Sequence, residues 1–224
     1  MLVKCEFDDK PLIIMEKLGP SLDRLLHEYF RSGFSFKTVQ QIGIKMVTIL
    51  EQFHSIGYIH IDIKPDNICV ANGPNDTNKF PEIKLIDFGV CQPYIKNPNN
   101  FKEPLNDAEH IDFRMQPQKG NLIFASPNSV MDMVLSRRDD MISLFYLLLH
   151  LQTGELPFYK PNIKQSELKE YIINSKLNTS YIDLCRRFNS DHLIPFAKEV
   201  LSINFYDKPN YSKLRFLLEK NLLD

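Results

Sequence analysis

The chain has 224 residues, of which 43% are hydrophobic and 25% are charged, and its formal net charge is −1. These values are ordinary for a globular protein and exclude the compositions of disordered chains. The length predicts one domain, or one and a fraction. The balanced charge gives no general attraction to nucleic acid or anionic lipid, so any phosphate chemistry has to be local. The longest apolar stretch, 141–151, is well short of the ~20 residues that a membrane span requires.

The cysteine pattern argues against a disulfide framework or a metal site. The four cysteines show no C-x-x-C pairing and do not cluster with the histidines, so reduced, buried thiols are the simpler interpretation. The first residues of the chain hold no apolar signal-peptide core. We therefore expect an intracellular protein, cytoplasmic and/or nuclear.

The N-terminal segment predicts a hairpin and then a short helix. Apolar runs on either side of a polar turn at 8–11 predict a β-hairpin over residues 2–16. The Gly-Pro pair at 19–20 ends the second strand. Ser21 is expected to cap a helix whose apolar side chains fall on one face.

The middle of the chain predicts a long helix and a second hairpin. After the expected cap Ser35, apolar residues recur at three- and four-residue steps up to the Gly57 stop. Short apolar runs at 68–70 and 83–86 flank a polar loop and predict the hairpin. Residues 92–119 show no sustained period, and a loop of that length in a compact domain is usually functional or disordered.

The rest of the chain predicts helices. Ser136 opens a helix in which residues 141–149 are apolar on every side, which is typical of a helix at the centre of a domain. Further helices are expected around residues 166–174, 182–187, 192–202 and 211–221. The sequence therefore predicts an α+β fold that is mainly α-helical, with small β-hairpins and no internal repeat.

The residues that suggest chemistry lie on either side of the second hairpin. Residues 60–67 read H-x-D-x-K-P-x-N, and Asp87 opens a D-F-G triplet after the hairpin. Asp62, Lys64 and Asn67 leave one irregular turn, and the two strands can return the chain so that Asp87 faces them. Two carboxylates, an amide oxygen and an ammonium then suit Mg²⁺ with a triphosphate. The octapeptide pattern would arise by chance in roughly 1 in 10⁴ chains of this length.

These motifs resemble the catalytic loop and the metal-binding triplet of eukaryotic protein kinases. More closely, the chain is similar to the casein kinase 1 superfamily, which includes the vaccinia-related kinase branch. The matching segments are a hinge at 15–22, an Ala-Ser-Pro-Asn variant at 125–128, the Ser-Arg-Arg-Asp-Asp signature at 136–140 and a C-terminal helix motif at 207–215. The resemblance covers about residues 12–220.

The resemblance implies a protein-kinase-like fold from which the N-lobe is largely absent. Residues 1–16 would be a remnant N-lobe hairpin, residues 17–20 the hinge and residues 21–224 the helical C-lobe. The implied cofactors are ATP and Mg²⁺, and the implied substrates are protein Ser/Thr hydroxyls.

The resemblance also implies a role for each residue at the site. Asp62 would orient the acceptor hydroxyl and take its proton, and Lys64 would contact the transferred phosphate. The metal ligands would be Asn67 and Asp87. The adenine would lie against the backbone at Glu16 and Leu18, with Cys69 on the floor of its slot. Asp140 would hold the catalytic loop through His60 and nearby backbone amides, which is a structural role.

The chain departs from the family pattern most clearly at its N-terminus. Its eight glycines contain no G-x-G, and no V-A-I-K lysine is identifiable. Lys4 is the only upstream lysine on a predicted strand, and it is either a replacement for the missing lysine or a solvated strand residue. Because phosphoryl transfer depends on positioning and electrostatics, we expect the loss of these groups to be severe.

Smaller departures concern activation and substrate choice. Ile61 replaces the usual arginine, which predicts loss of phosphate-dependent activation. Asn121 stands where a threonine usually braces the catalytic aspartate, and Asn can still hydrogen-bond. Ile123 replaces an arginine of an anion pocket, which makes a preference for phosphate-primed substrates doubtful. Phe145 replaces a small glycine, which suggests local repacking.

Three arginines have two interpretations each. Arg137 and Arg138 either form salt bridges at a capped helix start, the simpler interpretation, or recognise substrate. Arg114 either orders a loop or contacts the acceptor. Phe88 is interpreted as a packing residue.

Two functional hypotheses remain open on the sequence. The first is a casein kinase 1-type serine/threonine kinase, present as an incomplete copy, whose partner is a protein substrate. The second is a pseudokinase lobe that acts as a scaffold for a protein partner, with exposed apolar surface where an upper lobe would pack. Neither hypothesis involves nucleic acid or a membrane, and the oligomeric state is left open.

Overall fold

The structure is a computed structural model that describes residues 3–7, 10–72, 80–96, 98, 110–111, 121–158 and 163–223. Most of the loop at 92–119, including Arg114, lies outside the described residues, as do Gly120 and the side chain of Lys4. The expectations for Arg114 and Lys4 therefore stay predictions.

The chain is mainly helical, as the sequence predicts. Its helices are α1 (Leu22–Glu28), α2 (Phe36–Ser55), α3 (Pro127–Val130), α4 (Arg137–Thr153), α5 (Gln165–Asn178), α6 (Tyr181–Arg187), α7 (Ile194–Leu201) and α8 (Tyr211–Leu223), with the 3-10 turns η1 (Pro65–Asn67) and η3 (Asp191–Leu193). Its strands are β1 (Val3–Phe7), β2 (Lys10–Ile14), β3 (Tyr58–Ile59), β4 (Ile68–Val70), β5 (Ile83–Leu85) and β6 (Gln92–Pro93).

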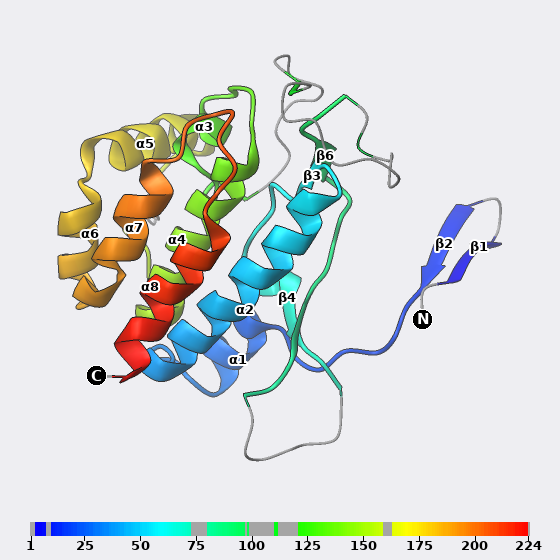
Figure 1. The fold of residues 1–224 in the computed structure, drawn as a ribbon, viewed down its shortest axis with the longest axis horizontal. Coiled ribbons are helices and arrows are strands. Elements are labelled where there is room, and N and C mark those ends of the chain that lie inside the picture. The colour runs from blue at the N-terminus through cyan, green and yellow to red at the C-terminus, as the bar shows by residue number, and fades with distance from the viewer. Residues whose placement is uncertain are drawn as a thin grey trace.

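Three helices form the centre of the molecule. α2 packs against both α4 and α8, and Figure 1 shows these three helices beside one another, with α5, α6 and α7 to one side. Ser35 caps α2 by accepting a hydrogen bond from the Thr38 N–H at 3.2 Å, as predicted. Nearly every residue of α4 is buried, because helices cover it on several sides.

Within the described residues, three antiparallel two-stranded sheets accompany the helices. The predicted hairpins are β1–β2 and β4–β5, and in the second Ile68 lies opposite Leu85. The first turn is shorter than expected, because Lys10 and Pro11 already belong to β2. In Figure 1 this first hairpin stands apart from the helical body, and its residues from Leu12 to Ile14 are exposed.

The third sheet was not predicted from the sequence. Gln92 and Pro93, at the start of the expected loop, form β6 and pair with β3. Two-residue strands are too short to show an alternating pattern, so no sequence signal marks them. The pairing brings the chain that follows the D-F-G triplet back beside the strand that enters the catalytic loop.

Within the described residues, no helix has both the length and the apolar character needed to cross a membrane.

The close packing of α2 on its neighbours can be tested at Gly43. A Cβ atom at this position would lie 2.9 Å from Leu218 Cδ1 and 3.1 Å from Leu148 Cδ1. We expect Gly43→Val to lower the free energy of unfolding by about 1–3 kcal/mol, because overpacking displaces side chains of α4 and α8. Urea denaturation measures the change.

The matched control is Gln52→Val on the exposed side of the same helix, which introduces the same branched side chain without a neighbour to displace. Equal destabilisation by the two variants would contradict the packing of α2 described above.

Candidate active site

The buried carboxylate of Asp140 organises the loop that follows β3. Asp140 lies in α4 and is 1% exposed. Its Oδ2 accepts from the backbone N–H of His60 at 2.7 Å, and its Oδ1 accepts from the N–H of Ile61 at 2.8 Å. These bonds confirm that Asp140 holds the catalytic loop through backbone amides at His60.

A histidine that sequence reasoning missed completes this network. His54 Nε2 lies 2.9 Å from Asp140 Oδ2, and His54 Nδ1 lies 2.7 Å from the hydroxyl of Tyr211. An ionised carboxylate only accepts, so Nε2 donates to it, and Nδ1 is hydrogen-bonded to the tyrosine hydroxyl. Burial alone would raise the pKa of Asp140, but the bond and charge of His54, with those of His60, lower it below its usual value.

Ile61 has a strained backbone that this network holds in place. Its φ angle is 71°, in the left-handed region that β-branched residues avoid. Such a conformation costs about 1–3 kcal/mol and persists only where the surroundings enforce it. The side chain packs in a small apolar cluster with Ile59, Tyr94 and Ile95. An apolar residue therefore occupies, in a hydrophobic setting, the position where protein kinases usually have arginine.

Asp62 is oriented by donors on three sides. Its Oδ2 accepts from Lys64 Nζ at 2.6 Å and from Asn67 Nδ2 at 2.9 Å, and its Oδ1 accepts from the backbone N–H of Asn121 at 3.1 Å. Burial would raise the pKa of Asp62, but the bonds from Lys64, Asn121 and Asn67 outweigh it, so the pKa lies below the usual value. The carboxylate is therefore ionised and held in one orientation at neutral pH.

Asn121 braces Asp62 by a route that differs from the expected one. The side-chain Oδ1 of Asn121 accepts from the N–H of Ile123 at 2.7 Å, so it stabilises its own turn. The contact to Asp62 comes from the backbone instead. A backbone donor is present whatever the side chain, and the sequence alone could not distinguish the two routes.

The residue before Asp87 is hydrogen-bonded to the backbone of Asn67. The N–H of Ile86 donates to the carbonyl of Asn67 at 2.9 Å, and His60 Nε2 donates to the carbonyl of Ile86 at 3.2 Å. Asp87 is the next residue, exposed, with a φ of 64°. Burial lowers the pKa of His60, and the charges of Asp62 and Asp87 both act against that effect. The bond from His60 to the Ile86 carbonyl brings the residue before Asp87 beside the loop that carries Asp62.

The donor set at Asn67 and Asp87 fits Mg²⁺. Asn67 Nδ2 faces both the side chain and the carbonyl of Asp62, so the amide oxygen points away from Asp62. One carboxylate and one amide oxygen leave positions for water and phosphate, which is how Mg²⁺ is usually bound beside a nucleotide. Within the described residues, no group of three or more His, Cys, Asp or Glu could hold a metal alone.

The segment at 17–20 runs beside β4, where the resemblance places the adenine. The N–H of Gly19 donates to the carbonyl of Val70 at 2.8 Å, and a Cβ at Gly19 would lie 2.9 Å from that oxygen. Only glycine permits this approach. Leu18 is partly buried next to it, and Cys69 of β4 is buried.

Glu16 lies at the exposed end of the same segment, with its Oε1 3.9 Å from Lys84 Nζ. The structure therefore brings Leu18 and Cys69 to neighbouring segments and Glu16 to their edge. Their contact with adenine stays a prediction.

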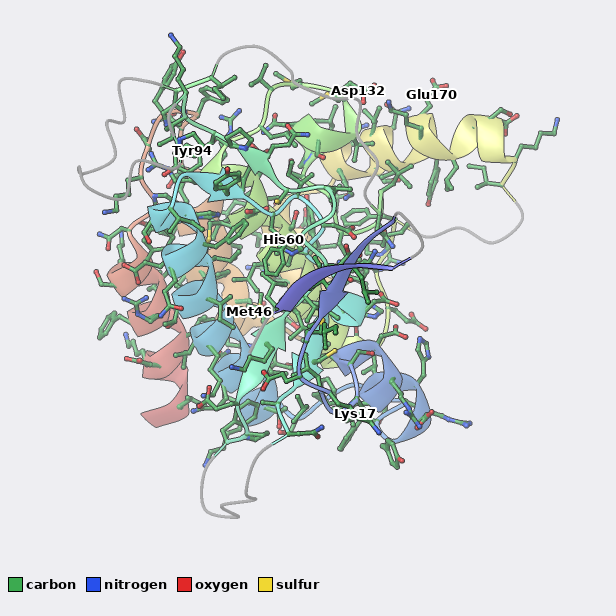
Figure 2. All side chains as sticks on the ribbon, turned by 90° about the vertical axis from the view of Figure 1, so that its right-hand side faces the viewer. Lys17, Met46, His60, Tyr94, Asp132 and Glu170 are labelled. Carbon is green, nitrogen blue, oxygen red and sulfur yellow. The ribbon has the colours of Figure 1, made fainter. Side chains whose placement is uncertain are left out.

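Phe88 packs as expected, although it is not fully buried. Its ring lies 5.3 Å from the ring of His60 and 5.3 Å from that of Phe53, measured between centroids. Its exposed fraction is 48%. In the view of Figure 2, His60 lies near the centre of the molecule, above Met46 of α2.

The structure favours the structural interpretation of the two helix-start arginines. Arg137 is 3% exposed, and its guanidinium donates to the carbonyl of Tyr206 at 3.0 Å and lies over the ring of Tyr94. Arg138 Nε is 3.8 Å from Asp139 Oδ2. Both side chains are engaged within the fold, Arg138 through this ion pair and Arg137 through hydrogen bonds and a ring contact. Phe145 is buried beside Tyr146, as local repacking predicts.

The fold and this site define a protein kinase domain. The protein kinase domain family matches residues 2–215, and the chain belongs to that family. It is 33% identical over 217 residues to a protein of Encephalitozoon cuniculi named "Probable casein kinase I homolog", which covers 96% of this chain and 63% of that protein. It is 32% identical over 215 residues to a "Probable serine/threonine-protein kinase" of Dictyostelium discoideum, which covers 94% of this chain and 39% of that protein.

The chain thus spans less than two thirds of the length of these two curated relatives. The family membership and the kinase-like fold agree with the resemblance drawn from the motifs.

The role of Asp140 predicts a specific cost for its isosteric amide. Asp140→Asn replaces one acceptor oxygen by an N–H₂ group, so one of the N–H groups that Asp140 now accepts loses its partner. We expect the free energy of unfolding to fall by about 1–3 kcal/mol, the usual penalty for a buried unsatisfied group. Urea denaturation provides the measurement.

The matched control is Asp183→Asn, since Asp183 is exposed on α6 and surface substitutions usually change stability by less than about 0.5 kcal/mol. If Asp140→Asn were as stable as this control, the carboxylate would not be organising the loop.

Proposed function

We propose that this chain is the catalytic part of a serine/threonine protein kinase of the casein kinase 1 type. The observation that carries the proposal is the arrangement of Asp62, Lys64 and Asn67, in which one ionised carboxylate is held by an ammonium and an amide. Family membership supports a kinase. The casein kinase 1 assignment rests on the flanking motifs and on the Encephalitozoon relative.

In the chemistry proposed for the site, the protein positions the reacting groups and stabilises charge, and it forms no covalent bond to them. Asp62 would accept a hydrogen bond from the acceptor hydroxyl and take its proton as the phosphoryl group transfers, and Lys64 would neutralise charge on that group. Asn67 and Asp87 would hold Mg²⁺, which when bound neutralises charge on the ATP phosphates. The segment at 17–20 with Cys69 would receive the adenine.

Several finer expectations stay proposals. The acceptors would be Ser/Thr side chains of proteins, and the protein would act inside the cell, in the cytoplasm and/or nucleus. Replacement of an arginine by Ile123 favours acceptors that are not phosphate-primed. That the sequence is an incomplete copy of a longer kinase also stays a prediction, which sequencing of the transcript upstream would test.

A second candidate function is a protein-binding scaffold with impaired catalysis. One observation favours it, an open groove of about 610 Å³ between α2 and β5. Several of its lining side chains are apolar, namely Ile44, Ile49, Phe53, Ile56, Leu85 and Phe88. Together with the exposed residues of β2, this groove gives the surface expected of a docking lobe.

A phosphotransfer assay on the purified protein tests the proposed function. With radiolabelled ATP, Mg²⁺ and a protein acceptor, we expect transfer that falls by about 10²–10⁴-fold in Asp62→Asn, the usual effect of removing a positioned proton acceptor. Asp87→Asn, which removes a metal ligand, should also fall strongly. The control Asp191→Asn changes an exposed carboxylate and should transfer like the unaltered chain.

The scaffold candidate predicts a different pair of results. It expects no transfer above that of Asp62→Asn and no thermal stabilisation by millimolar ATP with Mg²⁺. The kinase candidate expects stabilisation, about 2.7 kcal/mol at a ligand concentration 100 times Kd, and expects it to disappear in Asp87→Asn.

A further inference from the structure

A lysine outside the catalytic motifs is buried in an unusual setting. Lys176 lies on α5 and is 5% exposed. Its side chain points toward the segment at 121–125. Its Nζ donates to the carbonyl oxygens of Leu122 at 3.0 Å, of Ile123 at 2.8 Å, and of Ala125. An ammonium group carries three N–H groups, enough to donate to all three carbonyls.

Two aromatic rings also lie beside Lys176. Its Nζ lies 4.6 Å from the ring centroid of Tyr146 and 4.8 Å from that of Phe158. Burial lowers the pKa of Lys176 well below its ordinary value, while the three carbonyls and the two rings favour the charged form. A buried ammonium is costly. The groups that compensate it here are three carbonyls of the turn at 121–125 and two aromatic rings.

That turn reaches the catalytic aspartate. Asn121, the residue before the first of the three carbonyls, donates its backbone N–H to Asp62 Oδ1. The turn is closed by the Ile123 N–H on Asn121 Oδ1 and by the Ala125 N–H on the Asn121 carbonyl at 3.2 Å. Lys176 therefore holds carbonyls of the same turn whose first amide positions Asp62.

The far end of the turn has its own anchor. Ser126 Oγ donates to Asp139 Oδ1 at 2.6 Å, and Asn128 Nδ2 donates to the same oxygen at 2.9 Å. The N-terminus of α4 thus fixes the chain from Ser126 onward. Between that anchor and Asp62, the Lys176 side chain bonds three carbonyls of the turn, those of Leu122, Ile123 and Ala125.

We propose that Lys176 is a positioning residue that sets the turn at 121–125 and, through the Asn121 amide, the orientation of Asp62. It contacts neither substrate nor cofactor and acts through the backbone of that turn. The structural part concerns the turn alone, and only its consequence for catalysis rests on the proposed kinase function.

Lys176→Met provides the test, because methionine has a similar length and packs well on aromatic rings but donates no hydrogen bond. Hydrogen exchange of backbone amides is measured by NMR on the full chain. We expect exchange at Asn121 and Ile123 to become at least about tenfold faster, while the amides of α2 and α4 keep their protection. The Asn121 amide proton should also move upfield as its bond to Asp62 weakens.

Two further variants make the result specific. Lys169→Met, on the same helix, removes a half-buried lysine whose Nζ is 2.5 Å from Asp132 Oδ2, and it should leave exchange at 121–125 unchanged. Lys176→Arg keeps the positive charge and several donors, and it should restore at least part of the protection of Asn121.

Three results would overturn the proposal. One is unchanged exchange at Asn121 in Lys176→Met. Another is global unfolding of Lys176→Met, with protection lost throughout α2 and α4, which would make Lys176 an ordinary core residue. The third is an effect of Lys169→Met as large as that of Lys176→Met.

These readouts need no catalytic activity, so they are separate from the fate of the proposed function. If the chain transfers phosphate, Lys176→Met should lower kcat by at least tenfold with little change in the KM for ATP, since the adenine segment at 17–20 lies elsewhere. Faster exchange without a kcat effect in an active enzyme would limit the role of Lys176 to the turn and overturn its link to Asp62.

Discussion

The active-site loop depends on one buried carboxylate, that of Asp140. An ionised carboxylate that is 1% exposed is tolerated only where donors surround its oxygens. Here the donors are the backbone N–H groups of His60 and Ile61 and the ring of His54. These bonds hold Ile61 at a positive φ, and the next residue is Asp62. Because the buried Asp140 carboxylate must be hydrogen-bonded, it fixes the path of the loop that carries Asp62.

The groups around Asp62 come from segments that are far apart in the sequence. Lys64 and Asn67 belong to its own loop, and Asn121 approaches from the other side. Lys176 in turn binds the carbonyls next to Asn121. A hydrogen bond weakens steeply as its angle departs from linearity. The Asn121 N–H can therefore orient Asp62 only if the turn that carries Asn121 is itself held in place. The Asp62 carboxylate is thus supported by α4, through Asp140 and the loop at 60–61, and by α5, through the turn at 121–125.

The kinase and the scaffold candidates share one part of the surface. Phe88 follows Asp87, its ring packs on His60, and it also lines the groove between α2 and β5. Phe88 therefore borders both the candidate metal site at Asp87 and the candidate docking surface. Apolar surface of this kind usually marks a contact with another part of a protein or with a partner. A catalytic lobe and a docking lobe are therefore not structurally exclusive in this chain.

The sequence alone determined the class of protein, most of the helices and both hairpins, and it singled out the candidate site residues at 60–67. Local signals suffice for these features, since caps such as Ser35, apolar periodicity and the motif at 60–67 depend on neighbouring residues. Only the tertiary structure decided how His54, the Asn121 amide, β6 and Lys176 are used. A lone histidine, a backbone N–H, a two-residue strand and a single lysine carry no pattern in a sequence, and their roles arise when distant segments bury them against a partner.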